Sequence, residues 1–132
     1  MRIKVFTDGG ARGNPGMAGY GVIIKDEKGR KIYEESKFLG VKTNNEAEYL
    51  GLIAALNWIN NQNDLEVELY SDSELLVRQM RGEYKVKAAN LKNLWLTAKS
   101  LTESIKIKFI EIGRELNFEA DELANLAMDR EK

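Results

Sequence analysis

The sequence predicts an α/β protein with a five-stranded mixed sheet flanked by helices. Three segments that predict strands, residues 2–8, Gly19–Lys25 and Lys31–Leu39, follow one another at short spacing, which is typical of an antiparallel meander. Leu65–Tyr70 alternates apolar and polar residues and is a fourth strand, and Ile105–Ile112 is a fifth. Because helical segments precede the last two strands, we expect both to run parallel to the first.

The connections in the first half of the chain follow from turn-forming and helix-forming residues. Asp26–Arg30 forms the hairpin loop between the second and third strands, and Gly40–Thr43 is a short link. A helix from Asn45 to about Asn60 carries apolar residues around most of its circumference, so it should be largely buried. The amide-rich run that ends at Asp64 terminates this helix.

The second half of the chain alternates helices with loops. Ser71–Ser73 caps a short helix that runs to about Met80, and Arg81–Lys87 is a loop with local positive charge. A second helix follows, with amphipathic spacing at Leu91, Leu94, Trp95, Ala98 and Leu101. After the fifth strand, residues 113–116 form a loop, and Asn117 caps the last helix.

The composition indicates a soluble domain that lacks the chemistry of cysteine and histidine. A chain of 132 residues is one domain by length, so we expect residues 1–132 to share one core. The net charge of −1 means that a polyanion would have to meet a local patch or bound cations. The absence of cysteine and histidine excludes disulfides, thiolate and imidazole metal ligands, and histidine-dependent triads. With no apolar N-terminal segment or spanning run, we expect a cytoplasmic protein that makes no membrane contact.

The stretch Thr7–Gly16 places the carboxylate of Asp8 at the end of the first strand and then four glycines and a proline within Gly9–Gly16. This composition predicts a loop whose backbone is open to a ligand, because glycine allows close approach and positive φ. No Gly-Lys-Ser/Thr sequence closes the loop, and the glycine spacing is not that of dinucleotide-binding folds. A tight turn into the next strand is the alternative interpretation.

Four acids that are far apart in the sequence meet at one edge of the predicted sheet. Asp8 and Asp72 end the first and fourth strands, and Glu48 and Asp121 lie in the first turns of helices that leave the same edge. Open α/β sheets usually carry ligands there. Each acid also has an ordinary structural explanation: a turn for Asp8, a capping box with Asn45 for Glu48, an N-cap for Asp72 and the helix dipole for Asp121.

Taken together, the four carboxylates favour a metal site over four separate structural roles. Clustered carboxylates repel and raise one another's pKa, and divalent cations relieve that repulsion. Oxygen ligands without histidine or cysteine select Mg²⁺ or Mn²⁺ rather than zinc. Two such ions about 3.5–4 Å apart clamp the attacking and leaving oxygens of a phosphodiester, so that a near-neutral protein can hold a polyanion.

The motifs around these acids resemble type 1 ribonuclease H in order and topology, over nearly the whole chain. They are Thr7-Asp8-Gly9-Gly10 with Gly13-Asn14-Pro15-Gly16, Thr43-Asn44-Asn45-Glu46-Ala47-Glu48, Ser71-Asp72-Ser73, and Asn117-Phe118-Glu119-Ala120-Asp121-Glu122-Leu123-Ala124. The compact, histidine-free form is similar to archaeal and some bacterial members. The resemblance implies a five-stranded ribonuclease H-like fold and endonucleolytic hydrolysis of the RNA strand of RNA–DNA hybrids, leaving 5′-phosphate and 3′-hydroxyl ends.

The resemblance also implies roles for individual residues. Asp8, Glu48, Asp72 and Asp121 would bind two Mg²⁺ or Mn²⁺ ions, with Asp8 bridging both, and Glu46 would be a solvated charge in the first helical turn. Contacts to the hybrid would come from small residues and amides that touch an A-like minor groove without selecting sequence, and from a threonine at a DNA-strand phosphate. These residues are Gly9, Gly10, Asn14, Thr43, Asn44 and Asn45. For the asparagines, helix capping is the alternative, and it is compatible with binding.

The chain departs from the family pattern in three places. Well-studied members carry a histidine in the loop before the last helix, where this chain has Arg114 and Glu115. Arg114 is the candidate catalytic substitute, as an electrostatic contact to phosphate; Glu115 is the rival, and two solvated charges are the third interpretation. Glu74 stands where a glutamine often contacts RNA. The basic protrusion of some members is reduced to a short basic run: Arg78, Arg81, Lys85, Lys87 and Lys92.

Two other functions are compatible with this fold. One is another nuclease or strand transferase of the superfamily, and the other is a non-catalytic nucleic-acid-binding module. The glycine stretch, the segment Thr43–Asn45 and the absence of extra domains favour the hybrid-specific ribonuclease, and retention of all four acids argues against a decayed enzyme. We expect a monomer whose partner is an RNA–DNA hybrid duplex and which uses no organic cofactor.

Overall fold

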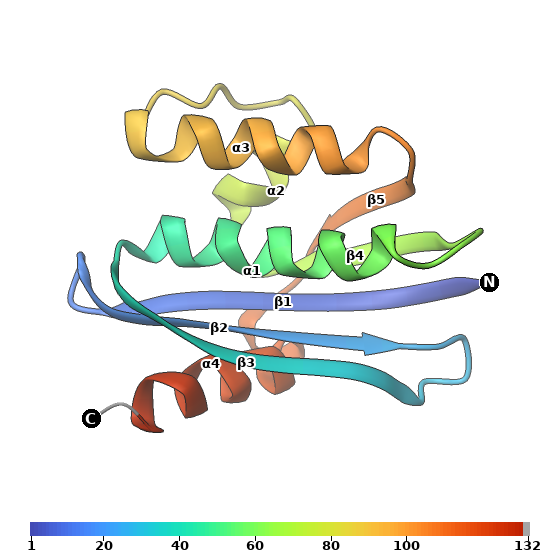
Figure 1. The fold of residues 1–132 in the computed structure, drawn as a ribbon, viewed down its shortest axis with the longest axis horizontal. Coiled ribbons are helices and arrows are strands. Elements are labelled where there is room, and N and C mark those ends of the chain that lie inside the picture. The colour runs from blue at the N-terminus through green and yellow to red at the C-terminus, as the bar shows by residue number, and fades with distance from the viewer. Residues whose placement is uncertain (131–132) are drawn as a thin grey trace.

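The computed structural model describes residues 1–130 and shows a five-stranded sheet in the order β3-β2-β1-β4-β5 (Figure 1). β1 (Arg2–Arg12), β2 (Gly16–Lys25) and β3 (Lys31–Lys42) form an antiparallel meander. β4 (Glu66–Ser71) runs parallel to β1, and β5 (Lys106–Glu111) runs parallel to β4. The predicted mixed sheet, with an antiparallel half and a parallel half, is confirmed.

Helices cover both faces of this sheet. α1 (Asn44–Asn60), α2 (Glu74–Met80) and α3 (Ala89–Thr102) lie on one side, and α4 (Phe118–Arg130) lies on the other (Figure 1). The expected burial of α1 is confirmed, because its side chains form much of the core against the sheet; they include Tyr49, Leu52, Ala55, Leu56 and Ile59. Within residues 1–130, none of the helices combines the length and apolar character needed to cross a bilayer.

The glycine stretch after Asp8 is mostly strand. Gly9–Arg12 pair with Met17–Tyr20 of β2, so only residues 13–15 turn the chain, with Gly13 at φ 97°. The prediction of a loop over Gly9–Gly16 is therefore wrong outside that turn. Glycine has low strand propensity, but α1 packs so closely here that a Cβ on Gly9 would lie 2.5 Å from the backbone nitrogen of Glu48.

Other boundaries shift by a few residues. β3 extends to Lys42, which pairs with Gly16, so the expected link over 40–43 belongs mostly to the sheet. α1 begins at Asn44, one residue early, while β4 spans residues 66–71 and β5 residues 106–111. Because β1 runs on to Arg12, the prediction that Asp8 ends the first strand is wrong. Asp8 instead lies just beyond Phe6, the last residue of β1 that pairs with β4, so it still lies at the carboxyl edge of the parallel half of the sheet.

α4 approaches the antiparallel half of the sheet closely because β2 offers glycines beneath it. A Cβ on Gly21 would lie 2.7 Å from the Cβ of Leu123, and one on Gly19 would lie 3.0 Å from the Cβ of Ala127. This contact fixes the start of α4 near the end of β1. The first turn of α4 contains Asp121, so the packing of glycines against α4 brings the last predicted acid to the sheet edge.

Candidate active site

Carboxylates from separate elements meet at the carboxyl edge of the parallel strands. Asp8 lies in β1, Glu48 near the start of α1, and Asp72 directly after β4. One oxygen from each of these three side chains lies within 4.8 Å of the other two. Asp121 lines the same cavity, which has a volume of about 320 Å³. The structure thus brings the four predicted acids together, three of them at mutual ligand distance.

The protein environment disfavours the charged forms of these acids. Burial, the charge of Asp72 and a hydrogen bond with Asp121 raise the pKa of Asp8 to about 8. Burial and the charges of Asp8 and Asp72 raise the pKa of Glu48 well above its ordinary range. Burial also raises the pKa of Asp72, whereas the positive charge of Arg114 opposes this rise. The cluster therefore carries more negative charge than its protein surroundings offset.

The donor set fits a hard divalent cation. Glu48 Oε1 is buried and has no hydrogen-bond partner among the described residues, and a buried oxygen without a partner costs free energy. A cation at this point would supply the missing partner and relieve the repulsion between the carboxylates. The available ligand atoms are carboxylate oxygens, and the chain has no histidine or cysteine, which favours Mg²⁺ or Mn²⁺ over softer metals.

The structural alternatives for Glu48 and Asp72 are wrong, because other residues cap the two helices. Thr43 Oγ1 accepts from the Glu46 backbone N–H at 3.1 Å, and Glu46 Oε1 accepts from the Thr43 N–H at 2.8 Å. Glu48 therefore takes no part in capping α1. The expectation that Glu46 is a solvated charge is wrong, because its side chain belongs to this capping box. Ser73 caps α2 by accepting from a backbone N–H at 3.2 Å, so Asp72 is not the cap.

The predicted substrate contacts divide between the cavity and its border. Gly9, Gly10, Asn44 and Asn45 line the cavity. Thr43 lies beside it as the N-cap of α1. The residues predicted to contact the hybrid thus lie next to the acids. The contacts themselves stay a prediction.

Asn44 and Asn14 join the β1–β2 hairpin to the start of α1. Asn44 Oδ1 accepts from the backbone N–H of Ala11 at 2.6 Å, and Asn14 Oδ1 accepts from the backbone N–H of Asn44 at 3.1 Å. Both bonds use the amide oxygen. Within residues 1–130, neither side-chain NH₂ group donates a hydrogen bond, so both remain able to donate to a ligand.

Arg114 and Glu115 occupy different positions relative to the acids. Arg114 begins the short 3₁₀ turn before α4, lines the cavity, and opposes the rise in pKa of Glu48 and Asp72 through its charge. Glu115 is not among the cavity residues, and its carboxylate folds back beside Gly113. The geometry therefore favours Arg114 over Glu115 as the residue in the position of the family histidine.

Asn117 has a positioning role that the sequence does not reveal. It precedes α4, but its side chain does not cap the helix as predicted: Oδ1 has no hydrogen-bond partner in the described chain. The residue is 1% exposed, and Nδ2 instead donates to the carbonyl of Thr7 at 3.0 Å, while a hydrogen bond from Asn117 lowers the pKa of Asp72. Asn117 thus joins the segment before α4 to the residue that precedes Asp8.

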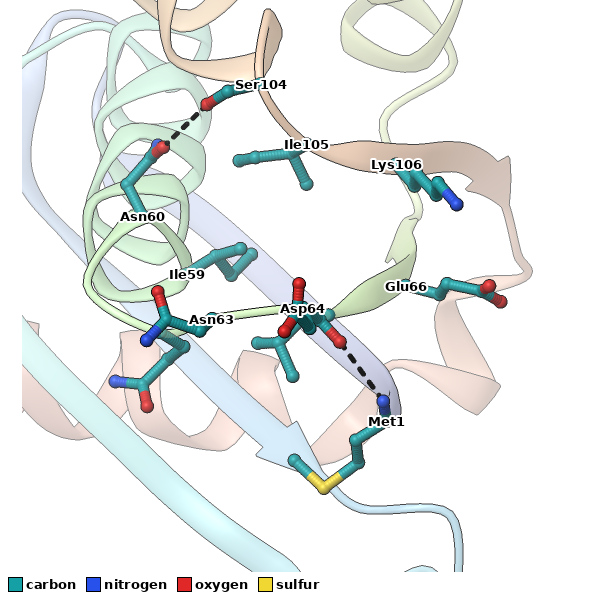
Figure 2. A pocket seen from close by; sticks show the side chains of 11 residues that line it. Met1, Ile59, Asn60, Asn63, Asp64, Glu66, Ser104, Ile105 and Lys106 are labelled. Atoms are coloured by element: carbon teal, nitrogen blue, oxygen red, sulfur yellow. Dashed lines mark hydrogen bonds between the residues drawn. The ribbon is translucent and has the colours of Figure 1, made fainter.

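A larger cavity of about 460 Å³ lies at the opposite end of the sheet, next to the N-terminus (Figure 2). Several of its polar groups already pair within the protein. The Met1 ammonium donates to the Asp64 carbonyl at 3.1 Å, Ser104 donates to Asn60 Oδ1 at 3.4 Å, and the Asn60 NH₂ group donates to two backbone carbonyls. The cavity lacks the clustered carboxylates of the smaller one, so the chemistry is expected at the carboxyl edge.

Comparison with known proteins agrees with this geometry. A family model described as "Reverse transcriptase-like" matches residues 6–127. A bifunctional protein of Mycobacterium tuberculosis is 41% identical over 131 residues, covering 98% of this chain and 36% of that protein. The chain thus spans little more than a third of the length of its mycobacterial relatives.

Two solved ribonucleases H1 share the fold closely. LC11-RNase H1, isolated from compost by a metagenomic approach, has a TM-score of 0.93 and 48% identity, covering 98% of this chain and 96% of that one. The enzyme of the halophilic archaeon Halobacterium salinarum has a TM-score of 0.92 and 32% identity, covering 98% and 99%. LC11-RNase H1 has also been solved in complex with an RNA/DNA hybrid, and that structure is 47% identical with a TM-score of 0.92, covering 97% of each chain.

These matches, with the sheet order and the cluster of acids, show that the chain belongs to the ribonuclease H family, as a type 1 member. The resemblance to archaeal members inferred from the motifs is confirmed by the Halobacterium structure.

Proposed function

We propose that the protein is an endonuclease that hydrolyses the RNA strand of RNA–DNA hybrids, leaving 5′-phosphate and 3′-hydroxyl ends. The observation that carries this proposal is the convergence of four carboxylates from four elements in one cavity, with a buried oxygen of Glu48 lacking a partner. The hybrid bound to LC11-RNase H1 supports the choice of substrate.

Asp8, Glu48, Asp72 and Asp121 would hold two Mg²⁺ or Mn²⁺ ions. When bound, such ions activate water and stabilise charge on the attacking and leaving oxygens of a phosphodiester. The carboxylates hold the site at the sheet edge, and Asp8, which interacts with both Asp72 and Asp121, is the ligand expected to be shared. Arg114 would contact the product phosphate as a fixed cation, since a guanidinium stays protonated and cannot act as a base.

The polar border of the cavity would bind the minor groove of the hybrid. Gly10 leaves room for close approach, and Gly9 lines the cavity beside it. The NH₂ groups of Asn14 and Asn44 are free to donate to 2′-hydroxyls, while their amide oxygens accept hydrogen bonds that fix the hairpin. Asn45 would add a further amide, and Thr43 a contact to a phosphate of the DNA strand. These groups select backbone geometry rather than base sequence, so cleavage should depend little on sequence.

We further propose that the protein acts as a monomer in the cytoplasm. The acids, Arg114 and the amides come from a single chain, which supports a site that needs no second copy. Light scattering after gel filtration, with and without hybrid, tests the oligomeric state.

A panel of labelled duplexes tests the activity. RNA–DNA, RNA–RNA and DNA–DNA duplexes of one sequence are incubated with Mg²⁺ or Mn²⁺, and products are mapped with their end groups. The proposal expects cleavage within the RNA of the hybrid. Cleavage of DNA duplexes or branched DNA would instead indicate another nuclease of the superfamily, and binding without cleavage a non-catalytic module.

A further inference from the structure

Arg12 is a basic residue at the border of the acid cavity that none of the roles above uses. It ends β1, four positions beyond Asp8, and lines the cavity. Its Nη1 donates to Asp129 Oδ1 in an ion pair, and its Nη2 donates to Asn125 Oδ1 at 3.3 Å. The side chain is 39% exposed, so the guanidinium is held in place but still reaches solvent.

The two residues that hold Arg12 belong to the helix that carries Asp121. Asn125 also lines the cavity, and its Nδ2 donates to the backbone carbonyl of Asp121 at 3.1 Å. α4 therefore fixes the positions of both Arg12 and Asp121. The neighbouring residue, Ala11, is bonded to Asn44 at the start of α1, so both sides of this segment of β1 are fixed.

The guanidinium retains donors after these contacts. An arginine has five N–H donors in a fixed plane, and two of them serve Asp129 and Asn125. Those that remain match the geometry of a phosphodiester, which arginine binds through paired hydrogen bonds. Arg12 and Arg114 are the basic side chains that line a cavity otherwise rich in carboxylates, so a polyanion has few cations to meet there.

We infer that Arg12 is a substrate-binding residue that grips a backbone phosphate of the hybrid at the border of the acid cavity, with Asp129 and Asn125 holding its guanidinium in position. This inference rests on the proposed function, since it names a contact that the hybrid makes at that site. Asp129 orients Arg12 and also partly neutralises it. Removing the charge of Asp129 should therefore strengthen the contact to phosphate, whereas removing Arg12 should abolish it.

A purely structural latch between the hairpin and α4 is the competing explanation, and it predicts different results. If the ion pair only braces the fold, Arg12→Ala and Asp129→Asn break the same bond and should have similar effects. Exposed ion pairs stabilise proteins little, so those effects would be small and confined to stability. The two explanations thus differ in the sign of the Asp129→Asn effect on substrate binding.

The experiment measures kcat and KM for a hybrid duplex in Mg²⁺ over a range of salt concentrations. Arg12→Ala should raise KM roughly tenfold, as expected for one charged hydrogen-bonded contact, and change kcat less than twofold. It should also make the dependence of log kcat/KM on log salt shallower by about 0.9, because one phosphate contact is lost. Asp129→Asn should leave KM unchanged or lower it, and Arg12→Lys should keep the salt slope while raising KM less than Arg12→Ala does.

Arg2→Ala is the matched control, because Arg2 is an exposed arginine at the other end of β1 that is ion-paired with Glu66 at 3.1 Å. It should change neither KM nor the salt slope. Equal losses in Arg12→Ala and Asp129→Asn, or an unchanged slope in Arg12→Ala, overturn the inference while wild-type cleavage of the hybrid leaves the proposed function intact. If the wild-type protein neither binds nor cleaves the hybrid, the proposed function and the inference both fail.

Discussion

Asp8 is a residue whose negative charge is disfavoured in the metal-free protein. It is 7% exposed and interacts with Asp72 and Asp121, which is why its pKa rises to about 8. In the proposed site, this carboxylate would be paired with metal rather than with a protein cation. Substituting Asp8 should therefore lower catalytic activity without lowering the stability of the metal-free protein.

Asp8→Asn should abolish cleavage, with a loss of at least a thousandfold in kcat, because a ligand expected to be shared by both ions loses its charge. The fold should survive, since the amide is isosteric and removes a repelling charge. Cleavage assays with Mg²⁺ and circular dichroism of the same sample provide the measurement. Near-normal turnover would contradict the assignment of Asp8 to the metal site.

The same variant tests the raised pKa in the absence of metal. Between about pH 4, where an unfolded aspartate titrates, and pH 8, the folded protein binds the extra proton on Asp8. Stability of the metal-free protein therefore falls as pH rises through this window. Asp8→Asn should flatten that fall, so that in EDTA at pH 8 to 9 its Tm exceeds that of wild type by a few degrees or more. Added Mg²⁺ or Mn²⁺ should raise the Tm of wild type more than that of the variant.

Arg114 and Glu115 can be separated by single substitutions. Because Arg114 lines the cavity and Glu115 lies back against Gly113, Arg114→Ala should lower kcat several-fold or more, and Glu115→Gln should be nearly silent. An arginine does not titrate near neutrality, so Arg114→Ala should leave the pH profile without a lost ionisation there. If Glu115→Gln is instead the damaging change, the role moves to Glu115; if both are silent, both are solvated charges.

Among the elements, the contact between β1 and α1 sets the spacing of Asp8 and Glu48. Gly9 touches the backbone of Ala47 and Glu48, and so holds the start of α1 against the strand that carries Asp8. The helix begins there because the Thr43–Glu46 capping box satisfies its first N–H groups. A side chain on Gly9 would push the first turn of α1, and Glu48 with it, away from the sheet.

Gly9→Ala should therefore destabilise the protein by about 1–3 kcal/mol, the usual cost of overpacking a tight contact. Gly10→Ala is the matched control, because the nearest atoms to its Cβ would lie 3.9 Å away, and its stability should stay within about 0.5 kcal/mol of wild type. Urea unfolding of the two variants at one pH measures both. Equal stabilities would show that α1 moves freely at this contact.

The elements were predictable where the pattern was periodic and not where tertiary packing overrode it. The alternation in β4 and the apolar surface of α1 identified both correctly, because burial on one or all sides leaves a visible period. The extension of β1 through Gly9–Arg12 was not predictable, since glycines in a strand are explained only by the helix that lies on them. The predicted capping of α4 by the side chain of Asn117 was wrong, because this amide donates to the carbonyl of Thr7 instead.

At the scale of the whole molecule, local charge rather than net charge governs the approach of a polyanion. The net charge is −1, and the short basic run is itself partly neutralised. Arg78 pairs with Glu74 at 3.3 Å and with Glu83 at 2.8 Å, and Arg81 lies 3.7 Å from Glu83. Lys85 and Lys87 then supply most of the unpaired positive charge between α2 and α3.

Lys85→Ala combined with Lys87→Ala should raise KM several-fold and leave kcat within about twofold, because phosphate contacts add affinity without touching the reacting atoms. The wild-type salt slope should be shallow, since few phosphates are neutralised, and the double variant should make it shallower still. Kinetics at several salt concentrations measure this. An unchanged KM would mean that the substrate does not cross the segment between α2 and α3.

Most of the candidate site could be foreseen because its acids lie just beyond the paired segments of the parallel strands or near the starts of helices at the same edge. The four acids follow from topology, since parallel strands and the helices after them open onto one edge. Arg12 and Asn117 could not be foreseen. Their partners, Asp129 for one and Thr7 for the other, lie more than a hundred residues away in sequence, and no local pattern reports such a contact.

The position of α4 in the chain has a consequence for synthesis on the ribosome. The chain through residue 72 emerges before α4 and already contains three of the acids, but Asp121 and the partners of Arg12 are translated only with α4. Until α4 docks, a nascent chain therefore leaves the surface of β2 at Gly19 and Gly21 uncovered and has an incomplete set of the proposed ligands. A chain on a ribosome that stalls before residue 121 therefore lacks one of the four proposed metal ligands, and we expect it not to cleave.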